Sequence, residues 1–116
     1  PRPDVPLPDL VAELSLTPEA FNRKFKGSPV KRAKRRGYLR NVAVALGNRG
    51  DPAAVPALAR VVQRETESLV RMHAAWALGQ IGGAEARAAL EDAMEHEREA
   101  GVRAELQAAL ERITTG

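Results

Sequence analysis

A short motif recurs along the chain at an interval of 32 residues, and this interval constrains the fold more than any other feature. Residues 45–48 read ALGN and residues 77–80 read ALGQ, while Ala57-Leu58 recurs as Ala89-Leu90. Self-similarity at this period is typical of stacked helix pairs, in which each pair buries its apolar face against the next. We therefore expect an all-α fold, a short right-handed α-solenoid of helix pairs.

Capping signals divide this pattern into helices. Asp51-Pro52 supplies an N-cap followed by a first-turn proline, and Ser68 is positioned to cap the next helix. We expect helices near residues 9–14, 17–26, 29–46 with a bend at Gly37, 52–64, 69–81, 84–97 and 102–113. Glycines are expected at helix ends, where left-handed backbone is needed, at Gly47, Gly50, Gly79, Gly82 and Gly83.

The whole chain is expected to form one domain with two parts. Residues 1–37 form a proline-rich lead and a basic helical segment packed on the solenoid, and residues 38–116 form the repeats with a C-terminal capping helix. A length of 116 residues suffices for a core without disulfides or metals. The first residue is proline rather than methionine, which suggests a piece of a longer protein.

Composition narrows the class of protein. Hydrophobic residues make up 44% and aromatic residues only 3%, which favours closely packed helices over a β-sandwich. Cysteine is absent, so this chain carries no disulfide and no thiolate-bound metal or cluster, and we expect a cytoplasmic location. No run approaches the roughly 20 apolar residues of a membrane span, and we expect no membrane partner.

A basic run is the feature that bears on function. Residues 22–40 contain nine of the 18 Lys and Arg residues and none of the 15 acidic ones, so the run carries about +9 and the remainder about −6. Such a surface attracts phosphate polymers or anionic membranes. On a helix from Pro29, an apolar stripe of Val30, Ala33 and Gly37 would dock on the solenoid while the cations face outward. This stripe is too thin for membrane insertion.

Two of these cations stand at an unfavourable end of the expected helix. Lys31 and Arg32 fall in its first turn, where the helix dipole disfavours positive charge by about 0.3–1 kcal/mol each. A bound phosphate would explain them, because it would also accept hydrogen bonds from the free N–H groups there.

Two family resemblances follow from these residues. Residues 70–82 read VRMHAAWALGQIG, which is similar to the short HEAT-like repeats of the bilin-lyase type. This motif identifies a fold and not a function. Residues 25–48 read FKGSPVKRAKRRGYLRNVAVALGN, which resembles the C-terminal signature of epoxyqueuosine reductase, and the proline-rich lead resembles the stretch after that family's second cluster-binding motif.

This second resemblance implies a role in tRNA modification. The family reduces the epoxide of epoxyqueuosine in tRNA, the last step of queuosine synthesis, with cobalamin and two [4Fe–4S] clusters, and its HEAT-like portion is implied to help hold the anticodon stem-loop. The chain has no cysteine and no cobalamin region, so we expect no catalysis and no cofactor on it. The implied partners are tRNA and the catalytic and ferredoxin-like domains of the parent protein.

The candidate RNA-binding residues all lie in or beside the basic run. They are Lys24, Lys26, Ser28, Lys31, Arg32, Lys34, Arg35, Arg36, Arg40 and Asn41. Asn41 is equally suited to ordering a turn, and Tyr38 to packing or to a phosphate or ribose contact.

Other side chains are expected to be structural. Phe21 and Phe25 lie one turn apart and Trp76 falls in the apolar register of the repeat, which favours core packing over base stacking. Arg71 and Arg103 recur at the 32-residue interval and are expected to make contacts within the solenoid. The acidic group Asp92, Glu95, Glu97 and Glu99 is expected to provide solubility or a docking surface.

Two functions from different classes remain. The first is an RNA-binding accessory domain of a tRNA-modifying reductase, with the basic run on backbone phosphates. The second is a HEAT-type scaffold for a protein partner, in which the basic run is incidental. Charge reversal combined with the salt dependence of tRNA binding distinguishes them.

Overall fold

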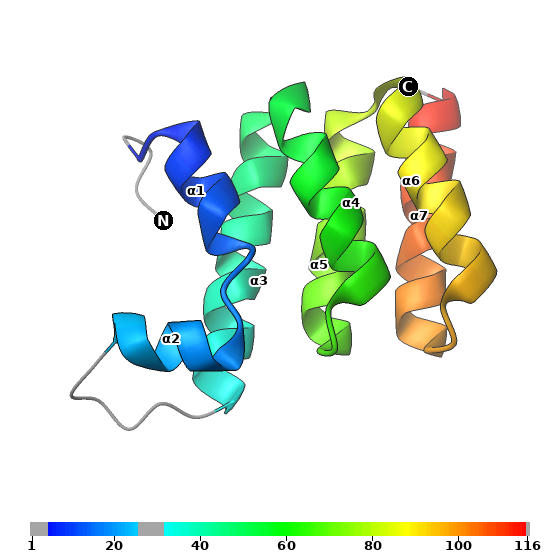
Figure 1. The fold of residues 1–116 in the computed structure, drawn as a ribbon. Helices are drawn as coiled ribbons and strands as arrows, with labels where there is room; N and C mark the ends of the chain where they lie inside the picture. The colour runs from blue at the N-terminus through cyan, green and yellow to red at the C-terminus, as the bar shows by residue number, and fades with distance from the viewer. Residues whose placement is uncertain (1–4, 26–31, 116) are drawn as a thin grey trace.

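A stack of antiparallel helices builds the chain (Figure 1). The computed structural model describes residues 5–25 and 32–115, with side chains for all of these except residues 32, 33 and 115. Within these ranges, seven α-helices and one 3-10 helix follow one another: α1 Leu7–Glu13, α2 Pro18–Lys24, α3 Arg32–Arg49, η1 Pro52–Ala54, α4 Val55–Arg64, α5 Ser68–Ile81, α6 Gly83–His96 and α7 Ala100–Thr115. No strand occurs in the described parts of the chain, and the expected all-α fold is confirmed.

The helices form two layers. Helices α3, α5 and α7 lie side by side in one layer, and α4 and α6 form the other layer, with α4 packed against α5 and α6 packed against α5 and α7 (Figure 1). At the N-terminal end, α1 and α2 pack against α3. The stack measures 46 × 32 × 16 Å, so it is a flat slab with two broad faces. This arrangement is the solenoid of helix pairs that the 32-residue interval predicts.

Equivalent positions of the two repeats fill the core. Leu46 and Leu78 are fully buried, as are Leu58 and Leu90. These four leucines share one hydrophobic cluster, which also receives Leu106 from α7. The last helix therefore buries the same kind of apolar face as a full repeat and closes the core at that end.

Two glycines that were expected to end helices instead lie inside them. A methyl group placed on Gly47 in α3 would lie 2.6 Å from Cζ3 of Trp76, and one on Gly79 in α5 would lie 2.7 Å from Cβ of Ala109. The prediction that these residues terminate helices is wrong, because their role is to let neighbouring helices approach closely. Their spacing of 32 residues reflects the repeated α3–α5 and α5–α7 contacts.

The other helix-end predictions have mixed outcomes. Asp51 is an N-cap, as expected, and its carboxylate accepts from the Ala53 N–H at 2.9 Å at the start of η1. Ser68 is not a cap: Glu67 occupies that position with extended backbone, and Ser68 is the first residue of α5. Gly82 has φ of +73° and ends α5, as predicted, because this backbone conformation strains other residues.

Helix α3 continues past the end expected for it. It runs unbroken from Arg32 through Gly37 and ends at Arg49 rather than at residue 46. The expected division of the chain into residues 1–37 and 38–116 stays a prediction. Gly37 does not belong to a docking stripe, since a methyl group added to it would meet no atom within 4 Å. Val30 and the expected helix start at Pro29 lie outside the described residues. None of the described helices is both long enough and apolar enough to cross a membrane.

Candidate nucleic-acid interface

Three aromatic rings pack α2 against α3, the two helices that carry the described part of the basic run. Thr17 caps α2 by accepting from the Ala20 N–H at 3.1 Å, which places Phe21 and Phe25 one turn apart over α3. Their ring centroids lie 5.6 and 5.4 Å from that of Tyr38 on α3, in edge-to-face geometry. Phe21 is 4% exposed. The prediction of core packing is confirmed for Phe21, and Tyr38 proves to be a packing residue.

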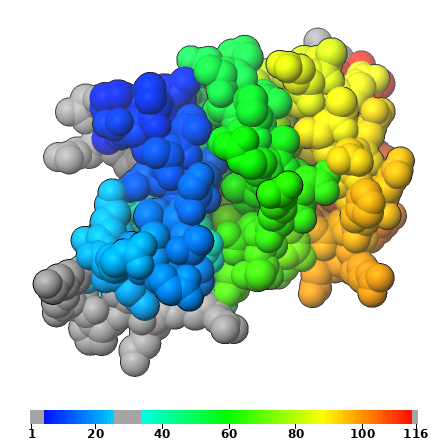
Figure 2. All heavy atoms as spheres, in the orientation of Figure 1, coloured from blue at the N-terminus to red at the C-terminus, as the bar shows by residue number. Residues whose placement is uncertain are grey.

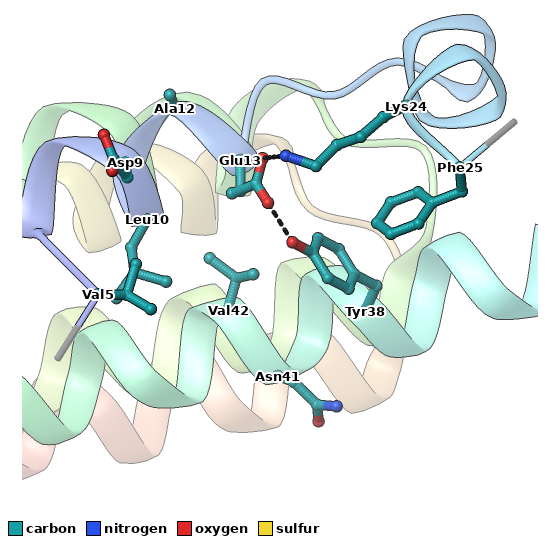
Figure 3. Close-up of a pocket in the computed structure, with 10 residues that line it drawn as sticks. All are labelled: Val5, Asp9, Leu10, Ala12, Glu13, Lys24, Phe25, Tyr38, Asn41 and Val42. Carbon is teal, nitrogen blue, oxygen red and sulfur yellow. Dashed lines mark hydrogen bonds and ion pairs between the residues drawn. The ribbon is translucent and has the colours of Figure 1, made fainter. Parts of the chain in front are cut away.

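A polar network completes this anchor. The Tyr38 hydroxyl donates to Glu13 on α1, and Lys24 Nζ lies 2.9 Å from the other carboxylate oxygen (Figure 3). Burial, followed by the hydrogen bond to Glu13 and the charge of that carboxylate, raises the pKa of Tyr38 to about 12. Lys24 thus closes one side of a groove of about 640 Å³ between α1, α2 and α3.

The described cations of α3 differ in their exposure to solvent and in whether another side chain already binds them. Lys34 is exposed and forms no hydrogen bond or ion pair with any described residue. Arg40 donates through Nε and Nη2 to Oδ1 of the exposed Asn41 at 3.3 and 3.2 Å, and Arg36 lies 3.4 Å from Glu67 with 38% of its side chain exposed. These three cations are available to an external anion.

Arg35 contradicts the expectation that it faces outward. Its guanidinium makes a bidentate pair with Glu65, at 3.1 and 2.8 Å, and donates through Nε to the Leu16 carbonyl at 2.9 Å. Only 9% of the Arg35 side chain and 7% of the Glu65 side chain are exposed. Its assignment as an RNA contact is therefore wrong: it shares the face of α3 that carries Leu39 and Val42, and it joins three segments of the chain.

The Glu65 carboxyl shows the electrostatic consequence of this pairing. Burial alone would raise its pKa, but hydrogen bonds from Arg35 and from the Glu67 N–H, together with the Arg35 charge, hold the pKa below its ordinary value. The negative charge of Glu65 is therefore already neutralised within the fold.

Arg71 is a structural residue, as predicted, and repeats this arrangement. It pairs with Glu97 through Nε and Nη2 at 2.8 and 2.9 Å, and its Nη1 donates to the carbonyls of Glu65 and Thr66. The hydrogen bonds from the Arg71 guanidinium to Glu97, with backbone N–H donors of Glu99 and Arg98 and the Arg71 charge, hold the pKa of Glu97 below its ordinary value against the opposing effect of burial. Glu97 therefore does not belong to the expected acidic docking surface.

Arg103 performs the carbonyl part of this role one repeat later. Its Nη1 donates to the carbonyls of Met94 and Glu97, both at 2.9 Å. The prediction that Arg103 is structural is confirmed. The signal that would have identified the acidic partners was present in the sequence, since Glu65 and Glu97 are themselves 32 residues apart.

Sequence reasoning missed two exposed cations outside the basic run. Arg60 and Arg64 lie one turn apart on α4 and line a second groove, of about 490 Å³, against the connection between α1 and α2. Four of the expected RNA-binding residues have no described side chain: Lys26, Ser28 and Lys31 lie outside the described residues, and only the backbone of Arg32 is described. Within the described ranges, no group of three or more His, Cys, Asp or Glu residues is arranged to hold a metal ion.

Known proteins that are similar to this chain include epoxyqueuosine reductases. Epoxyqueuosine reductase of Listeria monocytogenes is 32% identical over 108 residues, which cover 93% of this chain and 28% of that protein. A crystal structure of epoxyqueuosine reductase with an epoxyqueuosine-modified tRNA-Tyr stem loop matches with a TM-score of 0.81 and 27% identity, over 90% of this chain and 28% of the other.

The fold itself also serves a different enzyme. Human deoxyhypusine hydroxylase in complex with glycerol matches with a TM-score of 0.66 and 26% identity, over the full length of this chain and 46% of the other. The chain spans little more than a quarter of the length of the reductase relatives. The matches fit the C-terminal HEAT-like domain of those reductases and confirm that resemblance.

A family model supplies the remaining evidence. The model described as HEAT repeats matches residues 33–111, which extend from the start of α3 into the last turns of α7. The chain therefore belongs to the HEAT-repeat family.

Proposed function

We propose that this chain is the tRNA-binding accessory domain of an epoxyqueuosine reductase and that it holds the anticodon stem-loop of the substrate tRNA. The observation that carries the proposal is the solvent-accessible cationic surface of α2 and α3, formed by Lys24, Lys34, Arg36 and Arg40. It lies within the part of the chain that is similar to the reductases, one of which has been crystallised with a tRNA stem loop.

Recognition by this surface is electrostatic and follows the shape of the RNA. Arginine forks and lysine ammonium groups bind phosphate oxygens without reading bases. A stem presents regularly spaced phosphates, whereas the sequence of a paired stem is poorly accessible in its deep groove. Helix α3 carries three of the cations, and the Arg35–Glu65 pair fixes this helix against the α4–α5 connection. The surface is therefore held in a defined position before RNA arrives.

Catalysis belongs to the other domains of the parent protein in this proposal. The parent is a cytoplasmic oxidoreductase that uses cobalamin and two [4Fe–4S] clusters, and its catalytic and ferredoxin-like domains are partners of this chain. Thiolate ligation of a cluster requires cysteine, and this chain contains none. The task of this chain is to increase the affinity for tRNA and to orient the stem-loop toward the catalytic domains.

The test is the salt dependence of binding between the full 116-residue chain and a tRNA anticodon stem-loop. If about five phosphates are neutralised, the logarithm of the association constant falls with the logarithm of salt concentration at a slope of about −4. The double substitution Lys34→Glu/Arg40→Glu is expected to remove most of this binding without lowering the melting temperature, because neither side chain has an acidic partner among the described residues.

The matched control is Arg87→Glu/Arg98→Glu in the second repeat. Arg87 is half-exposed like Arg40, and Arg98 is exposed like Lys34, so the same charge change is made in similar surroundings. Both double variants alter net charge equally, and a difference between them therefore reports the location of the RNA. Equal binding by the two variants would reject the α3 surface. Stable binding of the parent's other domains by a chain that ignores RNA would instead support the protein-interaction scaffold.

A further inference from the structure

A second cationic site lies beside the Arg35–Glu65 pair. Its groove, of about 490 Å³, runs between residues 14–18, from the end of α1 to the start of α2, and one side of α4. Leu14, Ala57 and Val61 give it an apolar floor, and Arg60 and Arg64 stand along the α4 side. Figure 2 shows this face of the molecule, with α4 in green beside the blue α1–α2 region.

The two arginines give the groove a net positive charge. Both are exposed, and neither forms a hydrogen bond or ion pair with another described residue. Glu65 is the single acidic residue among the described residues that line the groove, and its carboxylate is taken up by Arg35. Like charges one turn apart on a helix repel each other, so the arginine pair does not stabilise α4 by itself.

The second repeat shows that the fold does not require these arginines. The positions 32 residues later carry Asp92 and His96, on a helix that packs in the same way. The corresponding groove, of about 290 Å³, contains the Arg71–Glu97 pair in place of Arg35–Glu65. The arginine–glutamate pair therefore recurs in both repeats (we call each such pair a bracket). The charge at the two neighbouring positions differs: it is positive on α4 and acidic or neutral on α6.

We propose that this first groove binds a phosphate group of the RNA backbone, with Arg60 and Arg64 as its ligands. Two guanidinium groups one turn apart offer paired N–H donors to the oxygens of a phosphodiester, and the apolar floor lowers the local dielectric and strengthens the interaction. Arg23 and Lys24 of α2, the helix that follows this connection, are also exposed. The RNA is thus held at two places, α3 and α4.

This inference rests on the proposed function, because it assigns a second binding place to the same RNA. The experiment compares three full-length chains for binding of the anticodon stem-loop across a series of salt concentrations: wild type, Arg60→Gln/Arg64→Gln, and the control Arg87→Gln/Arg98→Gln. The α4 variant is expected to bind about tenfold or more weakly than wild type. Its salt slope is expected to be smaller by about one, because the two substitutions together leave one phosphate without its cations. The control is expected to behave as wild type.

The outcomes separate this inference from the proposed function. If wild type binds RNA and the α4 variant matches the control in affinity and slope, the α4 groove is rejected while the α3 surface stands. If the α4 variant retains RNA binding but loses association with the parent's other domains, the groove is a protein-binding site and the inference is also rejected. If wild type shows no salt-dependent RNA binding, the proposed function fails and this inference fails with it. Thermal melting of all three chains shows whether each is folded.

Discussion

The same kind of contact, a largely buried arginine–glutamate pair, occurs at two places in the stack, but its surroundings differ. At the first, Arg35 on α3 pairs with Glu65 and reaches back to the carbonyl of Leu16. At the second, Arg71 on α5 pairs with Glu97 and reaches back to the carbonyls of Glu65 and Thr66. Arg35 therefore ties α3 to the α1–α2 and α4–α5 connections, and Arg71 ties α5 to the α4–α5 and α6–α7 connections.

The difference lies in what surrounds each bracket. The first has Arg60 and Arg64 beside it, and the second has Asp92 and His96 at the equivalent positions. Buried charges cost desolvation energy and are retained here only with full hydrogen bonding. The comparison shows that a repeat fold separates two tasks: recurring arginine–glutamate pairs fix the connections, and neighbouring exposed positions change charge without changing the stack.

The largest expected effect comes from breaking the first bracket. Arg35→Met should lower the free energy of unfolding by about 3 kcal/mol, because it leaves the Glu65 carboxylate buried without its partner. Arg71→Met should cost about 2 kcal/mol, since 15% of its side chain is exposed and water can replace part of the pairing. Denaturant unfolding monitored by circular dichroism measures both.

The double substitution Arg35→Met/Glu65→Leu is the control for this prediction. It removes both charges and should recover part of the stability that Arg35→Met loses. A double variant no more stable than Arg35→Met would show that the hydrogen bond to Leu16, and not the ion pair, carries the effect.

A smaller effect is expected where helices of neighbouring pairs approach closely. Gly47→Ala should destabilise the fold by about 2 kcal/mol, because the new methyl group would lie 2.6 Å from Trp76 and 3.0 Å from the Ala77 backbone. Gly79→Ala should cost a similar amount against Ala109. Gly37→Ala in the same helix as Gly47 should stabilise by up to about 1 kcal/mol, since it meets no neighbour and improves helix propensity.

Thermal melting of the three variants compares the two junctions directly. Opposite signs for Gly37→Ala and Gly47→Ala, which lie in one helix, would separate close packing from helix propensity. A neutral Gly79→Ala beside a destabilising Gly47→Ala would show that α7 can shift where α5 cannot.

The smallest expected effect concerns acid stability. Folding lowers the pKa values of Glu65 and Glu97 below the ordinary value of 4.5, so their contribution is complete above that pH and is lost as the pH falls through the lowered folded values. Stability should therefore decrease progressively below about pH 4.5. Glu65→Gln and Glu97→Gln should each be less stable at neutral pH and should each flatten this acid dependence. Unfolding curves collected between neutral pH and pH 3 test whether both junctions contribute.

The sequence predicts the architecture well, because the residues that recur at the 32-residue interval are largely those that the stacked helices bury. Leu46 and Leu78, or Leu58 and Leu90, recur at the interval that brings them into equivalent places, and the same interval identifies Arg71 and Arg103 as structural. Gly47 and Gly79 recur equally clearly, but glycine permits both chain reversal and close approach. Local sequence does not distinguish these two uses; the neighbour on the adjacent helix does.

The candidate site is predicted less well, because charge alone does not reveal direction. Arg35 stands in a run of cations, yet it lies four residues before Leu39 and seven before Val42, on the buried face of α3. Of the predicted docking stripe of Val30, Ala33 and Gly37, the structure tests only Gly37, which is not on that buried face. Arg60 and Arg64 give no signal in the sequence because two cations in a mixed segment form no run, and only the fold brings them beside the α1–α2 connection.

Helix α3 has a mechanical consequence. Its 18 residues form one rod of about 27 Å, with cations in its early turns and core leucines in its later ones. The rod also contacts α1, and no break divides the turns that carry the cations from the turns that enter the core. The cationic turns and the first helix of the solenoid are therefore parts of one continuous helix, and the fold itself sets their relative orientation.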